Sequence, residues 1–203
     1  MPVYSLEDVV PVVDPSSFVH PQAVLIGDVI IGPRCYVAPG ASLRGDMGRI
    51  VVGAGSNVQD NCVFHTFPGR DLLLEEDSHI GHGAVLHGCT IKRAALVGIS
   101  AVVMDGVIIG EQALVAAASF VRAGFVVPPR TLVMGAPARV VRELTEEEIA
   151  WKSTGTREYQ DLTVRCLAAL QECQPLSTVP PGRESAAARP VTTVPLHTLE
   201  RRK

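Results

Sequence analysis

The sequence predicts an all-β solenoid followed by one C-terminal α-helix. Three observations support this prediction: an aliphatic residue recurs every six positions, a small residue follows it four positions later, and a helix-capping pattern stands after the last repeat. Hydrophobic residues make up 47% of the 203 residues and aromatic residues only 4%, so we expect a core of small and branched aliphatic side chains. Such a core suits stacked strands better than a bundle of helices.

The first position of each repeat is Val, Ile, Leu or Phe throughout. The register breaks three times: three residues are inserted after Leu43, four are inserted after Phe64, and one is missing after Leu86. Neither the period of a helix nor the alternation of a single strand explains this spacing, whereas one repeat per side of a coil does. The lead residues, expected to point into the coil, are Val19, Leu25, Ile31, Val37, Leu43, Val52, Val58, Phe64, Leu74, Ile80, Leu86, Ile91, Val97, Val103, Ile109, Val115, Val121, Val127 and Val133.

Small or compact residues occupy the fifth position of most repeats. We expect them to fit the tight inner corners of the coil, where a larger side chain has no room. They are Ala23, Cys35, Ala41, Ser56, Cys62, Ser78, Ala84, Thr90, Ala95, Ala101, Ala113 and Ser119.

The repeats end near residues 134–139, so residues 1–140 are predicted to form a β-helix domain. Thr145 and Glu148 then match the Thr-x-x-Glu capping box, which predicts a helix from about Glu146 to about Cys173, with an interruption at Gly155 left open. This helix, within residues 141–175, is expected to pack on the β-helix. Residues 176–203 are rich in Pro, Ser and Thr and are predicted to form a flexible tail.

Composition argues against several classes of function. The net charge of −3, without a basic stripe interleaved with aromatic residues, gives no reason to expect nucleic-acid binding. No apolar run approaches the roughly 18 residues of a membrane-spanning helix, so no membrane partner is expected. The five cysteines form no Cys-x-x-Cys pair, which argues against a disulfide scaffold or a cysteine zinc site. The N-terminus lacks the features of a signal peptide, so the cytoplasm is the expected location.

Two of the six histidines fall in one column of the predicted coil. The repeats resemble those of hexapeptide-repeat β-helices, in which three repeats make one turn. This resemblance implies that lead positions 43, 64 and 86, which are three repeats apart, occupy the same side of successive coils. The residues that follow them, Arg44, His65 and His87, are expected to form an outward-facing stack. His82 lies on the preceding side and faces another direction. The remaining histidines lack this alignment and are assigned no role: His20, His79 and His197.

His82 of a neighbouring subunit, related by a three-fold axis, would complete a site with His65 and His87. Three imidazoles suit a divalent transition metal and leave a fourth position open for water or substrate. We therefore predict a homotrimer with a metal site at each subunit interface. Spacing alone leaves the alternative open that these are ordinary surface histidines.

The repeats resemble the hexapeptide motif [LIV]-G-x-x-[STAV]-x of left-handed parallel β-helices, most clearly at residues 31–35, 80–84 and 97–101. The resemblance implies a left-handed, triangular coil with three repeats per turn. The phrases LRGD at 43–46, NVQDN at 57–61 and GHGAVLHGC at 81–89 are similar to those of the γ-class carbonic anhydrase family. In that family the residues matching His65, His82 and His87 bind the metal between subunits.

The same resemblance implies roles for further residues. Arg44 and Asp46 match an ion pair buried at the trimer interface, and Gln59 matches a glutamine that orients the metal-bound water. We expect Tyr159, from the C-terminal helix, to hydrogen-bond into the site. Structural alternatives stay open for all four: an interface pair for Arg44 and Asp46, a corner residue for Gln59 and helix packing for Tyr159. The expected metal is Zn²⁺, although Fe²⁺ or Co²⁺ would also suit three imidazoles.

Residues 2–176 resemble the PaaY/CaiE branch of this family, through phrases such as FVHP at 18–21, AWK at 150–152 and GT-x-EYQ at 155–160. The resemblance implies a metal-dependent thioesterase that hydrolyses ring-epoxidised or related coenzyme A thioesters in phenylacetate catabolism. The choice between the PaaY and CaiE roles stays open. The expected chemistry is attack on the thioester carbonyl by a metal-activated water, with the oxyanion stabilised nearby.

Three other functions stay open. A γ-class carbonic anhydrase would hydrate carbon dioxide with the same metal, but efficient members carry a loop glutamate, and here the first glutamate after His65 is Glu75. Fast hydration is therefore not expected. A hexapeptide acyltransferase would use a histidine as base without a metal. A non-catalytic, carnitine-operon-like protein would keep the β-helix without turnover.

Overall fold

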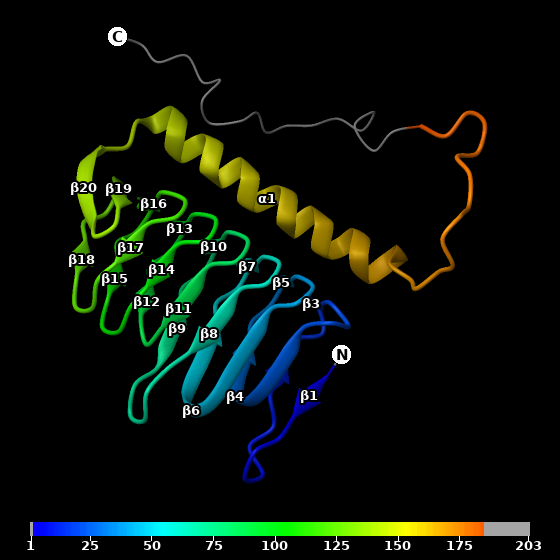
Figure 1. The fold of residues 1–203 in the computed structure, drawn as a ribbon, viewed down its shortest axis with the longest axis horizontal. Coiled ribbons are helices and arrows are strands. Elements are labelled where there is room, and N and C mark those ends of the chain that lie inside the picture. Colours follow the sequence, from blue (N-terminus) through cyan, green and yellow to red (C-terminus); the bar gives the residue numbers. More distant parts are fainter. Residues whose placement is uncertain (1, 185–203) are drawn as a thin grey trace.

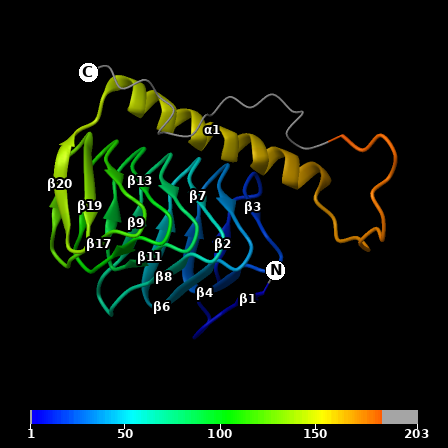
Figure 2. The same cartoon turned by 45° about the horizontal axis from the view of Figure 1, so that its top comes forward.

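The computed structural model describes residues 2–184, which form a left-handed parallel β-solenoid and a single helix, α1 (Glu146–Ala169), lying along one side of it (Figures 1 and 2). The left-handed coil expected from the resemblance is confirmed. The strands, in chain order, are β1 (Val3–Tyr4), β2 (Val12–Val13), β3 (Phe18–Val19), β4 (Val24–Ile31), β5 (Tyr36–Val37), β6 (Ser42–Val52), β7 (Asn57–Val58), β8 (Val63–His65), β9 (Leu72–Leu74), β10 (His79–Ile80), β11 (Val85–His87), β12 (Thr90–Ile91), β13 (Leu96–Val97), β14 (Val102–Val103), β15 (Ile108–Ile109), β16 (Leu114–Val115), β17 (Phe120–Val121), β18 (Val126–Val127), β19 (Thr131–Gly135) and β20 (Ala138–Glu143).

The strands stack along the coil as parallel ladders. One ladder runs β3-β5-β7-β10-β13-β16-β19, and β20 closes it antiparallel to β19. The other two sides of the coil are hydrogen-bonded into one sheet, because the long strands β4 and β6 continue around a corner. The first residues of β6 pair with β8 and its last residues pair with β9. The three residues inserted after Leu43 therefore lengthen β6 instead of breaking the coil.

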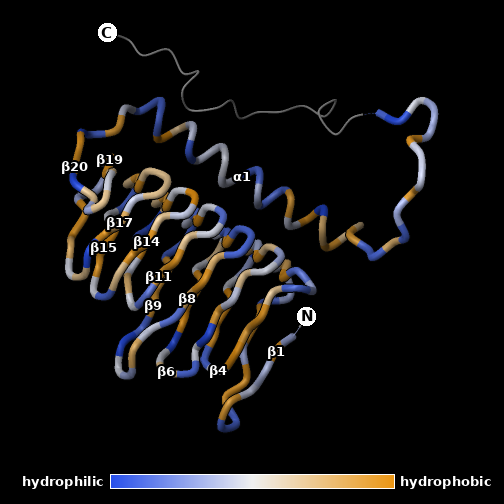
Figure 3. The backbone as a smooth tube through the Cα atoms, viewed as in Figure 1, coloured by the Kyte–Doolittle hydropathy of each residue, from blue (hydrophilic) through white to orange (hydrophobic). Residues whose placement is uncertain are grey.

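The repeat places the core as predicted. Every lead residue is at most 2% exposed, apart from Val19, which is partly buried at the open end of the coil. Figure 3 shows this pattern as hydrophobic strands separated by hydrophilic turns. The predicted corner residues are buried too, with one exception, Thr90. Because one residue is missing after Leu86, Thr90 begins strand β12 beside Ile91, and the buried Cys89 stands at the corner instead.

Helix α1 begins where the capping box predicts. The Glu148 amide donates to Thr145 Oγ1 over 3.2 Å, and the Thr145 amide donates to Glu148 Oε2 over 2.9 Å. The helix runs unbroken through Gly155 and ends at Ala169, so the interruption considered at Gly155 does not occur and the helix is shorter than expected. It packs across β3, β5 and β7 (Figure 2).

The predicted end of the β-helix domain and the predicted tail both lie toward the C-terminal end of the chain. The predicted division at residue 140 falls within β20, and residues 170–184 form neither helix nor strand. The rest of the predicted tail, with His197, lies outside the described residues. No helix among residues 2–184 is long and apolar enough to cross a bilayer.

Candidate metal centre

His65 and His87 stand side by side on adjacent coils. Strands β8 and β11 pair in parallel with His65 opposite His87, as the repeat register predicts. Their rings approach so that His65 Nδ1 lies 3.2 Å from His87 Nε2. Both side chains are largely covered in the single chain, and the exposed ring of Phe67 lies edge-on to His87 at a centroid distance of 4.8 Å.

Each of these two imidazoles is held by a carboxylate on its other nitrogen. His65 Nε2 lies 2.9 Å from Asp46 Oδ1, and His87 Nδ1 lies 2.7 Å from Asp105 Oδ1. A carboxylate accepts hydrogen bonds, so it places the N–H of a neutral imidazole on the nitrogen facing it. His65 Nδ1 and His87 Nε2 are then two lone pairs pointing at each other. Only a shared proton or a cation relieves this contact.

The spacing of these two nitrogens suits a metal ion. Two ligands of a tetrahedral Zn²⁺, each at about 2.0–2.1 Å, are separated by about 3.3 Å. The carboxylate–histidine arrangement is also the usual outer support of metal-binding imidazoles, because it fixes the tautomer and the ring orientation. The residues present therefore fit a divalent transition metal, with Asp46 and Asp105 orienting its ligands.

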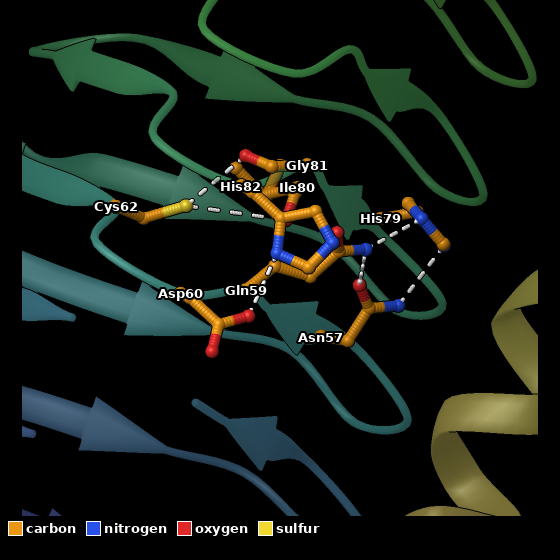
Figure 4. Close-up of polar contacts among 8 residues, drawn as sticks. All are labelled: Asn57, Gln59, Asp60, Cys62, His79, Ile80, Gly81 and His82. Carbon is orange, nitrogen blue, oxygen red and sulfur yellow. Dashed lines mark hydrogen bonds and ion pairs between the residues drawn. The ribbon is translucent and has the colours of Figure 1, made fainter. Parts of the chain in front are cut away.

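His82 stands at a different corner of the coil. It follows β10, and its Nδ1 lies 2.7 Å from Asp60 Oδ2, so its Nε2 is the free nitrogen (Figure 4). Its side chain is 46% exposed, in contrast to His65 and His87. Among residues 2–184 of one chain, no three His, Cys, Asp or Glu side chains converge on a possible metal ion. One chain thus carries two separate parts, a His65/His87 pair and a single His82.

Gln59 belongs to the same corner as His82. It is 3% exposed, and its backbone amide donates to the Ile80 carbonyl on the next coil. Its Nε2 lies 3.0 Å from Asn57 Oδ1 and 2.7 Å from His79 Nε2 (Figure 4). His79, to which the sequence assigns no role, therefore contacts a predicted site residue. Burial lowers the pKa of His79 from 6.5 to about 4, so this imidazole is neutral at physiological pH.

The other predicted site residues divide between the two corners. Arg44 Nη1 forms an ion pair with Asp46 Oδ2 over 3.2 Å, which links it to His65. The Tyr159 ring from α1 meets His79 edge-on at 5.4 Å and packs against Tyr36. Tyr159 therefore stands with Gln59 and His79, on the side of His82.

Several supporting residues were missed from the sequence, and the repeat register contains the signal that would have found them. Asp105 stands 18 residues after His87, which is one full coil, and Asp60 and Asn57 each stand 22 residues before the histidine that they contact. Polar residues one coil from a histidine are its neighbours in space.

Glu75, the first glutamate after His65, is engaged elsewhere. It accepts hydrogen bonds from Lys92 Nζ over 2.7 Å and from the Arg93 amide over 2.9 Å. These bonds, the Lys92 contact above all, lower the pKa of Glu75. A carboxylate held in this way is a poor proton shuttle.

Comparisons with known proteins agree with the fold and narrow the family. No family model matches the chain. The carnitine operon protein CaiE of Citrobacter koseri is 57% identical over 183 residues, which is 90% of this chain and 93% of the relative. CaiE of Escherichia coli strain K12 is 54% identical with the same coverage.

Two solved structures are similar along most of the chain. A putative acetyltransferase of Bacillus cereus has a TM-score of 0.81 and 34% identity, covering 82% of this chain and 96% of that one. A hexapeptide transferase family protein from Anaplasma phagocytophilum has a TM-score of 0.77 and 36% identity, covering 81% and 97%. The curated names above are those of carnitine operon proteins and lend no support to the phenylacetate role. By this identity over nine-tenths of its length, the chain belongs to the CaiE family of hexapeptide-repeat proteins.

Proposed function

We propose that this CaiE-family chain forms a homotrimer and hydrolyses acyl-coenzyme A thioesters at metal centres shared between subunits. Each centre would combine the His65/His87 pair of one chain with His82 of the next. In the reaction, water adds to the thioester carbonyl, the carbon–sulfur bond breaks, and a carboxylate and the thiol of coenzyme A are released. The CaiE names direct attention to carnitine-derived acyl groups, and the names of the two similar structures to acyl transfer.

The observation that carries the proposal is the contact between His65 Nδ1 and His87 Nε2 at 3.2 Å, with a carboxylate behind each ring. A metal bound there would supply a Lewis acid that polarises the thioester carbonyl and activates water. Asp46 and Asp105 keep the two metal-facing nitrogens unprotonated, and Asp60 does the same for His82.

Gln59 and the residues around it supply polar groups beside His82. Gln59 directly precedes Asp60, which holds His82, so both side chains belong to one corner of the coil (Figure 4). Its role is to orient the attacking water by a hydrogen bond. Arg44 neutralises the second oxygen of Asp46 and so keeps that carboxylate aligned with His65.

A second candidate function is acyl transfer without a metal. It is favoured by the transferase names of the two similar structures and by the histidine–carboxylate pairs, either of which could serve as a general base. The two candidates differ in their need for metal. Protein stripped of metal would keep its acyl-transfer activity, whereas its hydrolytic activity would be lost.

The test measures bound metal and the hydrolysis of a thioester panel for the wild type, His82→Ala and the matched control His20→Ala. The panel contains carnitine-derived, phenylacetyl and short alkyl thioesters of coenzyme A. The wild type and His20→Ala are expected to bind metal and hydrolyse at least one thioester. His82→Ala should lose metal and more than about 100-fold in rate, since even loss of an outer-shell partner costs about 10–100-fold. Equal metal content and rates in both variants would rule out the proposed centre.

A further inference from the structure

His79 lies between the coil and the C-terminal helix. It begins β10, opposite Asn57 of the preceding coil, and its ring is covered by α1. Its Nε2 lies 2.7 Å from Gln59 Nε2, and its Nδ1 lies 3.1 Å from Asn57 Nδ2 and 3.4 Å from Thr156 Oγ1. Thr156 belongs to α1 and is 4% exposed. His79 thus connects a residue of the candidate site with a residue of the helix.

Asn57, Gln59 and His79 form a closed ring of three contacts, and a neutral imidazole cannot satisfy all of them. A neutral imidazole has one N–H and one accepting nitrogen, and each amide has a donating and an accepting end. If His79 Nε2 accepts from Gln59, the second proton of the Gln59 NH₂ is donated to Asn57 Oδ1. The NH₂ of Asn57 then faces His79 Nδ1–H, which is a contact between two donors. If the tautomer is reversed, a contact between two acceptors results instead. The ring alone therefore does not select a tautomer.

Thr156 determines which tautomer of His79 is favoured. Its hydroxyl has a single proton, which is donated to the Lys152 carbonyl over 3.3 Å, so Thr156 Oγ1 can only accept from His79. Within residues 2–184, the polar atoms that contact the ring nitrogens of His79 are Asn57 Nδ2, Gln59 Nε2 and Thr156 Oγ1. Thr156 Oγ1 is the one oxygen among them. Its presence favours the proton on Nδ1 and leaves Nε2 as the acceptor.

This tautomer determines how Gln59 is oriented. With Nε2 of His79 accepting, both protons of the Gln59 NH₂ are used, one by His79 and one by Asn57 Oδ1. The carbonyl oxygen of Gln59 is then its free polar atom. With the other tautomer, the amide would rotate and offer NH₂ instead. A free oxygen accepts a hydrogen bond from water, whereas a free NH₂ would compete for the lone pair with which the water attacks.

We propose that Thr156 and His79 are positioning residues through which helix α1 fixes the amide of Gln59 with its oxygen free to hold the attacking water. The inference rests on the proposed function for its catalytic consequence, but the orientation of Gln59 is a property of the fold by itself. It also gives α1 a role in the site in addition to covering one side of the coil.

The test compares substitutions that keep the relevant polar atom with substitutions that remove it. Thr156→Val removes the hydroxyl at nearly constant volume, and Thr156→Ser keeps it. His79→Gln keeps an acceptor, and His79→Leu removes it. Thr156→Val and His79→Leu should lower kcat about tenfold, the value of roughly one hydrogen bond, with KM and bound metal unchanged. Thr156→Ser and His79→Gln should retain most of the wild-type kcat. Equal kcat in Thr156→Val and Thr156→Ser would overturn the inference.

A second measurement is independent of activity. Nitrogen NMR of histidine-labelled trimer reports which ring nitrogen of His79 carries the proton. We expect Nδ1–H in the wild type and Thr156→Ser, and a shift toward Nε2–H in Thr156→Val. A wild-type protein with Nε2–H contradicts the inference whatever its activity. If the wild type hydrolyses no thioester, the proposed function fails, and the tautomer alone decides whether the helix orients Gln59.

Discussion

Each of the three candidate ligand histidines has a carboxylate of its own within 2.9 Å: Asp46 for His65, Asp105 for His87 and Asp60 for His82. A surface histidine needs no such partner, and three separate pairings are hard to explain by coil packing alone. The pairs make each imidazole present one chosen nitrogen. In the single chain, two of those nitrogens already face each other across 3.2 Å.

Asp105 is the simplest residue with which to test whether a carboxylate supports its histidine as a metal ligand. The resemblance to the γ-class carbonic anhydrase family implies no role for it. Asp105→Asn keeps the volume but can no longer fix the tautomer of His87, because an amide offers a donor as well as an acceptor. We expect metal affinity to fall about 10–100-fold. Competition with a coloured chelator measures this, with the exposed Asp71→Asn as control. Unchanged affinity in Asp105→Asn would show that the carboxylate does not support a metal ligand.

Lys152 is a buried lysine of helix α1 whose charged form is disfavoured in the folded chain. It is 1% exposed, its Nζ donates to the Ala94 carbonyl, and burial lowers its pKa from 10.5 to about 8, with Asp77 opposing the shift. Between about pH 8 and pH 10.5 the unfolded chain holds a proton that the native chain has released. The contribution of Lys152 to the free energy of unfolding therefore rises with pH in this window.

Lys152→Met is accordingly expected to raise the free energy of unfolding by about 1–3 kcal/mol at pH 7. The gain should shrink as pH rises above 8, because the native lysine is then neutral. Guanidinium unfolding of the wild type and Lys152→Met at pH 7, 8.5 and 9.5 measures the difference in their free energies of unfolding. The buried cysteines titrate in both proteins, so their contribution cancels in this difference. A gain independent of pH, or a loss at pH 7, would show that Lys152 carries no charge penalty in the folded chain.

The candidate site could be predicted in part at this scale. The register of the repeat was enough to predict that His65 and His87 lie opposite each other, because one coil separates them. Alignment with the other histidines gives His79 no role, although Asn57 stands opposite it in the coil. The contact of His79 with Thr156 spans 77 residues, and nothing in a six-residue repeat determines where a distant helix will lie.

At the scale of elements, a glycine in the helix and a glycine at a corner of the coil differ in the space around them. Gly155 sits inside α1, where a Cβ would meet only His79 Cε1 at 4.0 Å. Gly81 sits at a corner of the coil, where a Cβ would lie 2.8 Å from the Ile99 backbone nitrogen. The first position has room for a side chain and the second has none.

Gly155→Ala should therefore stabilise the protein by about 1 kcal/mol, since glycine in a helix interior costs about that much relative to alanine. Gly81→Ala should destabilise it by about 1–3 kcal/mol, because backbone must move. Chemical denaturation of the two variants measures both signs. A loss of stability in Gly155→Ala would mean that the glycine meets a constraint that this fold does not show, such as contact with another subunit.

The elements themselves were largely predictable because their causes are local. The capping box of Thr145 and Glu148 sets the start of α1, and each strand from β3 to β19 contains a lead residue of the repeat. The end of the helix was not predictable in the same way. No glycine or proline stands near Ala169, and the predicted end at Cys173 had only the later Pro175 to mark it.

For the whole molecule, the solenoid explains why the candidate centre is incomplete in one chain. Residues on one side of the coil stack with each other, while the side before them faces elsewhere. His65 and His87 end strands of one ladder and His82 follows a strand of another. No local change brings the two corners together, so a second chain is required if all three histidines bind one ion.

The shared centre is tested most directly by mixing two inactive variants. His82→Ala and His65→Ala are each expected to lack bound metal and activity. When the two are co-expressed with different tags and mixed trimers are isolated, some interfaces pair an intact His65/His87 with an intact His82. In a closed trimer that contains both variants, about one interface in three is of this kind, so roughly a third of the wild-type metal content and hydrolysis should return. Mixed trimers that recover neither metal nor activity would contradict a centre built from two chains.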